Sequence, residues 1–109
     1  MNADTYRGFI PNYNVDSIPV LESIAKEHGW HIQHAEHKGE FYVLGYFVDA
    51  YDKDNNIVIE YDEPHHYIDA ENNVLCEDDI ARQKEIIEYL HCEFWRYNEK
   101  TKCLWKVVF

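Results

Sequence analysis

The stretch that decides the fold of this chain is residues 45–66, GYFVDAYDKDNNIVIEYDEPHH. It holds the end of one run of aromatic and β-branched residues, 41–51, and the whole of a second, 57–62, a composition typical of β-strands. The residues between the runs, DKDNN, tolerate the backbone conformations of a turn. The two runs are therefore expected to pair as a hairpin that brings Asp49 beside Glu60.

Carboxylates and imidazoles gather at the ends of these two expected strands. Glu60 and Asp62 lie two positions apart, so their side chains point to the same face of a strand. Pro-His-His, residues 64–66, follows almost at once. Carboxylate oxygens select hard cations, and a histidine outside the metal shell is free for proton transfer. The pattern therefore predicts a divalent-metal site, with Mg (or Mn) as the cofactor.

Length and composition indicate one domain over residues 1–109. A chain of 109 residues is of ordinary domain size, and an apolar fraction of 46% is enough for a hydrophobic core. No apolar run approaches the roughly 18 residues of a membrane span. The first residues, MNADT, have neither the basic start nor the apolar segment of a signal peptide. We therefore expect no membrane partner and a cytoplasmic, intracellular location.

Cysteine usage and net charge exclude some functions. The cysteines, Cys76, Cys92 and Cys103, are odd in number and have no CxxC spacing, so reduced, buried thiols are favoured over a disulfide or a structural zinc site. The formal charge of −11 argues against a broad phosphate-binding surface, because nonspecific DNA affinity comes mainly from Lys and Arg. Carboxylates that belong to a metal site would explain part of this excess.

The order of expected elements is α-β-β-β-α-β-β, which indicates the α/β (α+β) class. After an irregular lead-in at residues 1–16, periodicity predicts a helix that Gly29 ends, strands, a second helix and a closing hairpin. Gly45 within the long strand suggests a bulge or a close backbone approach. The helices are expected at 17–29 and 77–89, the strands at 30–36, 41–51, 57–62, 92–97 and 103–109, and a polar loop at 67–74.

The spacing of the acidic and histidine residues resembles a known superfamily. Asp49 lies eleven residues before Glu60-Tyr61-Asp62, and His66 and then DIAR at residues 79–82 follow. This resembles the PD-(D/E)XK nuclease superfamily, within it the branch of very short patch repair endonucleases and EDxHD homing endonucleases. The resemblance covers residues 17–97 and leaves out the lead-in and the closing hairpin, 98–109. It implies a Mg-dependent DNA endonuclease on the restriction-endonuclease-like fold, a mixed sheet flanked by helices.

The resemblance also implies site residues. Asp49 is similar to the metal-bridging aspartate and Glu60 to the acidic residue of the second strand, and Tyr61 would add its backbone carbonyl to the metal. The helix glutamate, the histidine after the second strand and the aspartate that opens the second helix would be Glu22, His66 and Asp79. Glu22 lies next to the apolar stripe of its helix and is expected at the core edge. Two departures are Asp62, where many members keep a lysine, and Val48, where many keep a proline.

In such a site, His66 would act as general base and Asp79 would orient its other ring nitrogen. His65 is structural or contacts substrate, because adjacent residues in an extended segment cannot both face one point. Arg82 forms a local pair with Asp79 or contacts a phosphate. Arg96 lies in an aromatic strand, where a phosphate or carboxylate partner is expected.

Two further alternatives stay open. In the first, the acids are simply solvated on an exposed hairpin, although a carboxylate in an apolar strand such as Asp49 fits that interpretation poorly. A second hypothesis keeps the fold and drops catalysis, leaving an acidic protein-binding or scaffold module, which the charge favours. If the chain is a nuclease, DNA is its partner, and a homodimer or a basic partner would supply the affinity. A phage or mobile-element origin rests on analogy alone.

Overall fold

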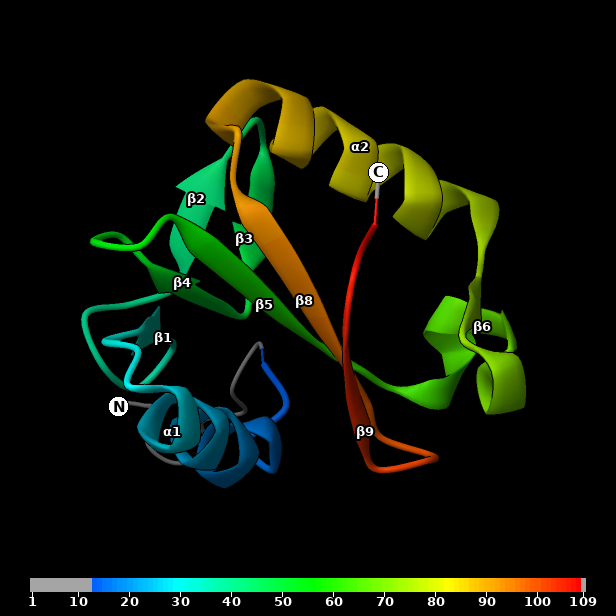
Figure 1. The fold of residues 1–109 in the computed structure, drawn as a ribbon, viewed down its shortest axis with the longest axis horizontal. Helices are drawn as coiled ribbons and strands as arrows, with labels where there is room; N and C mark the ends of the chain where they lie inside the picture. Colours follow the sequence, from blue (N-terminus) through cyan, green and yellow to red (C-terminus); the bar gives the residue numbers. More distant parts are fainter. Residues whose placement is uncertain (1–12, 109) are drawn as a thin grey trace, which may run out of the picture.

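The computed structural model describes residues 13–108, so most of the expected lead-in lies outside the described part. The elements follow one another as drawn in Figure 1. They are α1 (Ser17–His28), β1 (Gln33–His34), β2 (Phe41–Val43), β3 (Tyr46–Val48), β4 (Ala50–Asp52), β5 (Ile57–Asp62), the 3₁₀ turn η1 (Pro64–His66), β6 (Tyr67–Asp69), the 3₁₀ turn η2 (Ala70–Asn72), β7 (Val74–Leu75), α2 (Glu77–Leu90), β8 (Glu93–Asn98) and β9 (Cys103–Lys106).

The main sheet of the described part is mixed and five-stranded, with the order β1-β4-β5-β8-β9. Its central strands β5 and β8 pair in parallel, and the other neighbours pair antiparallel. The chain reaches β8 from β5 by way of α2, because parallel strands need a crossover connection. The protein therefore has an α+β fold with a mixed sheet, as expected, and β8–β9 is the expected closing hairpin.

The two helices cover opposite faces of this sheet (Figure 1). On one face, Ile86 and Ile87 of α2 pack with Val58 and Phe94. On the other, apolar residues of α1 pack with Ile57 and Ile59 of β5. Because side chains alternate along a strand, Glu60 and Asp62 belong to the α2 face. The alternation of side chains along β5 therefore allows the Glu60 and Asp62 carboxylates to share one site on the α2 face of the sheet.

The hairpin expected to bring Asp49 beside Glu60 is confirmed. Strands β4 and β5 are antiparallel, with Ala50 opposite Ile59. Asp49, one residue before β4, therefore lies beside Glu60, and its backbone N–H donates to the Glu60 carboxylate at 3.0 Å. The sequence-based register is correct because the turn and the apolar faces of both strands agree on it.

The single long strand expected at residues 41–51 is wrong. The segment folds into a small hairpin, β2 and β3, and then continues as β4 in the main sheet. Leu44 and Gly45 form its turn with φ of 53° and 85°. Two consecutive residues with positive φ give the tight turn that matches strand twist. No close approach explains Gly45, since a Cβ built there would meet nothing within 4 Å.

Other expectations need smaller corrections. The strand expected at 30–36 is reduced to β1, and the loop expected at 67–74 contains the short antiparallel pair β6–β7. The cysteines are free, as expected, but only Cys92 is buried, while Cys76 is half-buried and Cys103 exposed. No helix in residues 13–108 has the length and apolarity that a membrane crossing requires.

Candidate functional site

A polar cavity of about 520 Å³ opens where β5 ends. Both Asp49 and Glu60 line it, as do His66 and Arg82. Acidic side chains predominate in its wall, so it attracts a cation. The other lining residues are Tyr13, Asn14, Ser17, Glu40, Phe47, Tyr61, Asp62, Glu63 and Asp79.

The carboxylates of Asp49 and Glu60 form the floor of this cavity. The Glu60 carboxylate accepts the backbone N–H of Asp49, and Glu60 is only 6% exposed. Burial raises the pKa of both carboxyl groups, and for Glu60 the neighbouring charge of Asp49 raises it further. Two buried carboxylates this close repel each other when both are ionised, and a divalent cation between them would remove that repulsion.

Strand geometry also aims the backbone of Tyr61 at this pair. Its N–H donates to Asp49 Oδ2 at 2.9 Å, on the edge of β5 that β4 no longer covers. The next carbonyl, that of Asp62, accepts from Glu99 on the opposite edge. Since N–H and C=O of one strand residue point to the same edge, the Tyr61 carbonyl faces Asp49. A backbone oxygen therefore joins two carboxylates, which is a donor set for a hard cation.

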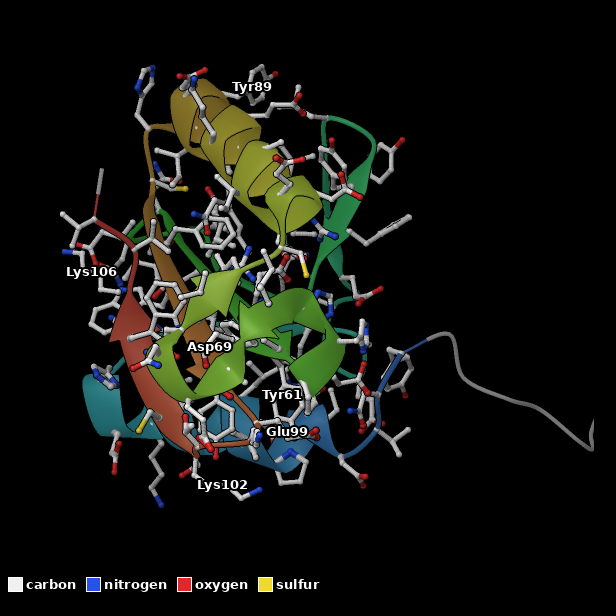
Figure 2. All side chains as sticks on the ribbon, turned by 90° about the vertical axis from the view of Figure 1, so that its right-hand side faces the viewer. Tyr61, Asp69, Tyr89, Glu99, Lys102 and Lys106 are labelled. Carbon is white, nitrogen blue, oxygen red and sulfur yellow. The ribbon has the colours of Figure 1, made fainter. Side chains whose placement is uncertain are left out.

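The Tyr61 side chain does not take part in this site. It lies on the α1 face of the sheet, where its hydroxyl donates to Glu99 at 2.6 Å. Figure 2 shows Tyr61 and Glu99 next to each other. The ring stacks with Tyr97 at 5.5 Å between centroids. These contacts fix the end of β5 and with it the position of the Tyr61 backbone carbonyl.

His66 and Asp79, which also line the cavity, form a pair. His66 Nδ1 lies 3.0 Å from Asp79 Oδ1, so the aspartate orients the ring as the sequence suggested. Asp79 belongs to the first turn of α2, and His66 to the 3₁₀ turn η1. The other ring nitrogen, Nε2, is left for a ligand or for proton transfer.

Arg82 also lines the cavity, but its partner is not the Asp79 carboxylate expected from the sequence. Its guanidinium pairs with Glu60 Oε2 at 2.8 Å and donates to the Phe47 carbonyl at 2.7 Å. Asp79 pairs with His66 instead, so the local Arg82–Asp79 pair is not formed. Arg82 partly offsets the buried charge of Glu60 and is 27% exposed. It is the arginine that lines the cavity.

Asp62, which lines the cavity, forms a buried pair with Arg96. Arg96 Nη1 donates to Asp62 Oδ1 at 2.7 Å, and the Tyr67 hydroxyl donates to Asp62 Oδ2 at 2.8 Å. Arg96 also donates to Gln83 of α2. A phosphate or a carboxylate partner is expected for Arg96 from the sequence, and the structure provides a carboxylate, that of Asp62. With 1% of its surface exposed, Arg96 supports the site from within and does not reach substrate as placed.

Glu22 is not brought to the site. It lies on α1, which covers the other face of the sheet, and its carboxylate contacts His34 Nε2 at 3.0 Å. Instead, Glu40 lies in the cavity wall, and burial raises the pKa of its carboxyl group, followed by the charge of Glu60. The sequence offered no clear signal for Glu40, because it precedes the unexpected β2–β3 hairpin. Helix periodicity predicts that Glu22 lies at the edge of a hydrophobic core, but it does not indicate which face of the sheet the helix covers.

His65 belongs to the same 3₁₀ turn as His66 and is exposed. Its ring lies 4.3 Å from that of His66 between centroids, so a turn, unlike an extended segment, lets both rings lie together. The structure thus brings together Asp49, Glu60, Tyr61, His66, Asp79 and Arg82 in one cavity wall, and His65 lies next to His66 without lining the cavity. Glu22 and Arg96 lie outside the cavity wall.

Comparison of the chain with protein-family models, with curated proteins and with solved structures gives no match. The functional argument therefore rests on the residues and their geometry.

Proposed function

We propose that this chain is a Mg-dependent (or Mn-dependent) endodeoxyribonuclease with a restriction-endonuclease-like fold of the PD-(D/E)XK type. The observation that carries the proposal is the Asp49–Glu60 pair, with Glu60 buried and Asp49 half-buried, which lines the same cavity as the His66–Asp79 pair. Buried like charges are costly, so their presence needs a function. The mixed sheet with a helix on each face supports the fold assignment.

Asp49, Glu60 and the Tyr61 carbonyl would hold the metal. All three donors are oxygens, and two are carboxylates whose mutual repulsion a cation relieves, so the residues fit Mg²⁺ or Mn²⁺. Such an ion, when bound, neutralises charge on a scissile phosphate and lowers the pKa of a bound water. Asp62, at the position where many members of the superfamily keep a lysine, is bound by Arg96 and Tyr67 and does not replace that lysine.

His66 would take the proton from the attacking water. Asp79 holds its Nδ1, which fixes the ring and leaves Nε2 as the acceptor. Because His66 and Glu60 line the same cavity, a phosphate seated there would have the base on one side and the carboxylates on the other. Arg82 lines the same cavity, and its guanidinium would be available to bind that phosphate.

DNA affinity needs a source outside this cavity, given the net charge of −11. Within residues 13–108, both arginines, Arg82 and Arg96, are paired with carboxylates. A homodimer or a basic partner would supply the missing phosphate contacts. Weak cleavage by the isolated chain at low salt is therefore consistent with the proposal.

Nicking of a supercoiled plasmid tests the proposal most directly. Wild-type protein with Mg²⁺ or Mn²⁺ at low salt should convert the plasmid to the open-circle or linear form, and chelator should stop the reaction. The same cations should raise the melting temperature, because they bind only the folded state. Absence of both effects, in a protein shown by circular dichroism to be folded, would contradict the proposal.

The role of His66 predicts a pH dependence. At saturating Mg²⁺, cleavage should rise with pH as the imidazole loses its proton, then level off, because only the neutral ring accepts a proton. His66→Gln should lower the plateau rate by roughly 10²-fold or more, the usual contribution of a general base. Metal-induced stabilisation should persist, since the proposed metal ligands are other residues. An unchanged rate, or a larger loss in His65→Ala, would show that His66 is not the base.

A second candidate function follows from the same charge. An acidic protein-binding or scaffold module would use the carboxylates as contacts for a basic partner, and it would neither nick DNA nor depend on His66. Asp49→Asn separates the candidates, because it removes metal-dependent stabilisation in the nuclease but changes little in the binding of a basic protein. The buried position of Glu60 favours the nuclease, since a carboxylate that is 6% exposed is poorly placed for a protein partner.

A further inference from the structure

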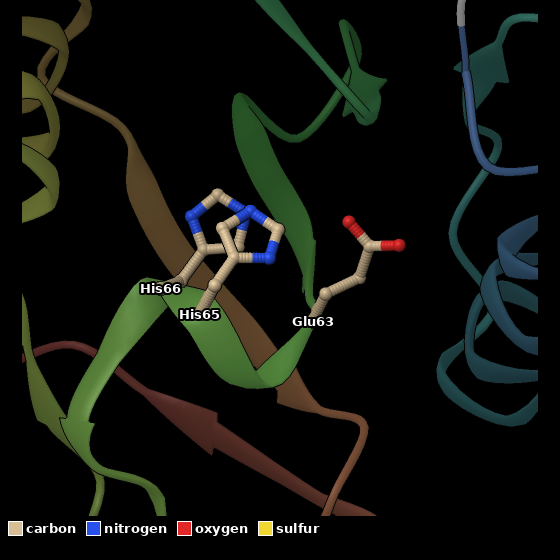
Figure 3. Close-up of side chains that lie close together, drawn as sticks. All are labelled: Glu63, His65 and His66. Atoms are coloured by element: carbon tan, nitrogen blue, oxygen red, sulfur yellow. The ribbon is translucent and has the colours of Figure 1, made fainter.

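Next to the carboxylate floor, the turn that follows β5 gathers a different set of donors. Glu63, His65 and His66 each offer one ligand atom, and these atoms lie within 4.8 Å of one another. Figure 3 shows the two imidazoles side by side and the Glu63 carboxylate on the same side of the turn. Donor atoms on one zinc ion lie roughly 3–3.5 Å apart, because each is about 2.0–2.2 Å from the metal, so small side-chain movements would bring these three donors to a single ion.

The backbone explains why the donors converge. Glu63 precedes η1 in an extended conformation, and Pro64 opens the 3₁₀ turn that carries both histidines. Neighbouring side chains diverge by about 120° in a 3₁₀ helix and by about 180° in a strand, so the turn allows the two histidine rings to approach each other. The histidine rings are accordingly 4.3 Å apart between centroids.

Two of the three donors are already held by further hydrogen bonds. Asp79 contacts Nδ1 of His66 at 3.0 Å, and Asn14 Nδ2 donates to Glu63 Oε2 at 3.0 Å. Metal-binding histidines usually have their second nitrogen bound to a carboxylate, which orients the ring and strengthens the ligand. This pattern leaves His66 Nε2 and Glu63 Oε1 as the atoms to which a metal would bind.

We propose that Glu63, His65 and His66 form a second metal site, one that takes Zn²⁺ or a similar nitrogen-seeking divalent cation. Imidazole donors prefer such ions to Mg²⁺, so the two sites differ in the metal they select. Occupation of this site removes the free nitrogen of His66. Resting on the proposed function, the further consequence is that Zn²⁺ inhibits cleavage by occupying the general base.

Binding is measured first, without DNA. Zn²⁺ is titrated calorimetrically into the full chain in excess Mg²⁺, which fills the oxygen site. Wild-type protein should bind Zn²⁺, and Glu63→Gln and His65→Ala should each weaken binding by at least about tenfold. The matched control His31→Ala changes another exposed histidine, remote from the cluster, and should bind as the wild type does. Affinity should fall at acid pH, because the histidines must be neutral to bind.

Inhibition is measured second, with each variant normalised to its own rate in Mg²⁺ alone. Zn²⁺ should inhibit the wild type, and Glu63→Gln should need at least about tenfold more Zn²⁺ for the same inhibition. Zinc binding without any cleavage would overturn the proposed function and keep the metal site. Cleavage without zinc binding would keep the proposed function and overturn the metal site. Zinc affinity that depends on Cys103 and not on Glu63 would overturn the site, because a thiol would then be the ligand.

Discussion

Asp49→Asn should reduce Mg-dependent nicking by at least about a thousandfold, because it removes a metal ligand whose contribution to charge stabilisation is several kcal/mol. Asparagine keeps the shape of the side chain and can still accept the Tyr61 N–H, so the fold should be retained. Rates are measured at several Mg²⁺ concentrations, which separates weak binding from loss of chemistry. Nicking at the wild-type rate would show that the metal binds elsewhere.

The same substitution should stabilise the metal-free protein at alkaline pH. Both carboxyl groups of the pair have a pKa raised in the folded state, so the folded protein holds protons that the unfolded chain has already lost. Wild-type stability in chelator should therefore decrease as pH rises from about 4 to 8. Asp49→Asn should reduce this decrease by about 1–2 kcal/mol, measured by thermal melting across that range. An identical pH dependence in both proteins would contradict the assignment.

Arg96→Met should destabilise the fold more than any change in the cavity wall. It leaves Asp62, which is 1% exposed, without its charged partner, and breaking a buried ion pair from one side costs about 3–5 kcal/mol. For a domain of this size that corresponds to a fall in melting temperature of more than about 10 °C. The measurement is thermal or denaturant unfolding at neutral pH.

The double variant Asp62→Leu/Arg96→Met is the control for that experiment. Replacing both charges by apolar side chains of similar volume removes the unpaired carboxylate, so much of the lost stability should return. A double variant as unstable as Arg96→Met would mean that the hydrogen bonds of Asp62 to Tyr67 matter more than its charge pair with Arg96. An Arg96→Met protein as stable as wild type would show that the Asp62–Arg96 ion pair does not stabilise the fold.

The sequence predicted those parts of the structure that depend on local signals. Both helices and the β4–β5 and β8–β9 hairpins follow from periodicity and turn composition. The contact of Asp49 with Glu60 follows from the hairpin register, and the His66–Asp79 pair was expected from the resemblance. These features involve residues close in sequence or fixed by strand parity.

The features that were missed depend on tertiary structure. Leu44 adopts a positive φ against its own preference, so Gly45 was the sign of the β2–β3 turn in the sequence, and a single glycine in a strand indicates a bulge as readily as a turn. The position of Glu40 depends on that turn. Glu22 was misplaced because the face of the sheet that a helix covers is decided by its connections and not by its own periodicity. The Arg82–Glu60 pair needs α2 docked on the sheet, which no local pattern reveals.

The parallel pairing of β5 with β8 has a kinetic consequence. The β4–β5 hairpin closes a short loop, but β5 and β8 come together only after the whole segment through α2 has been folded back between them. Closing so long a loop costs entropy before any hydrogen bond repays it, which slows folding. Asp49 and Glu60 should therefore meet early in folding, and Arg96 and Asp79 should join late. In refolding experiments DNA cleavage, which depends on Asp79 beside His66, should therefore appear only with the slowest phase.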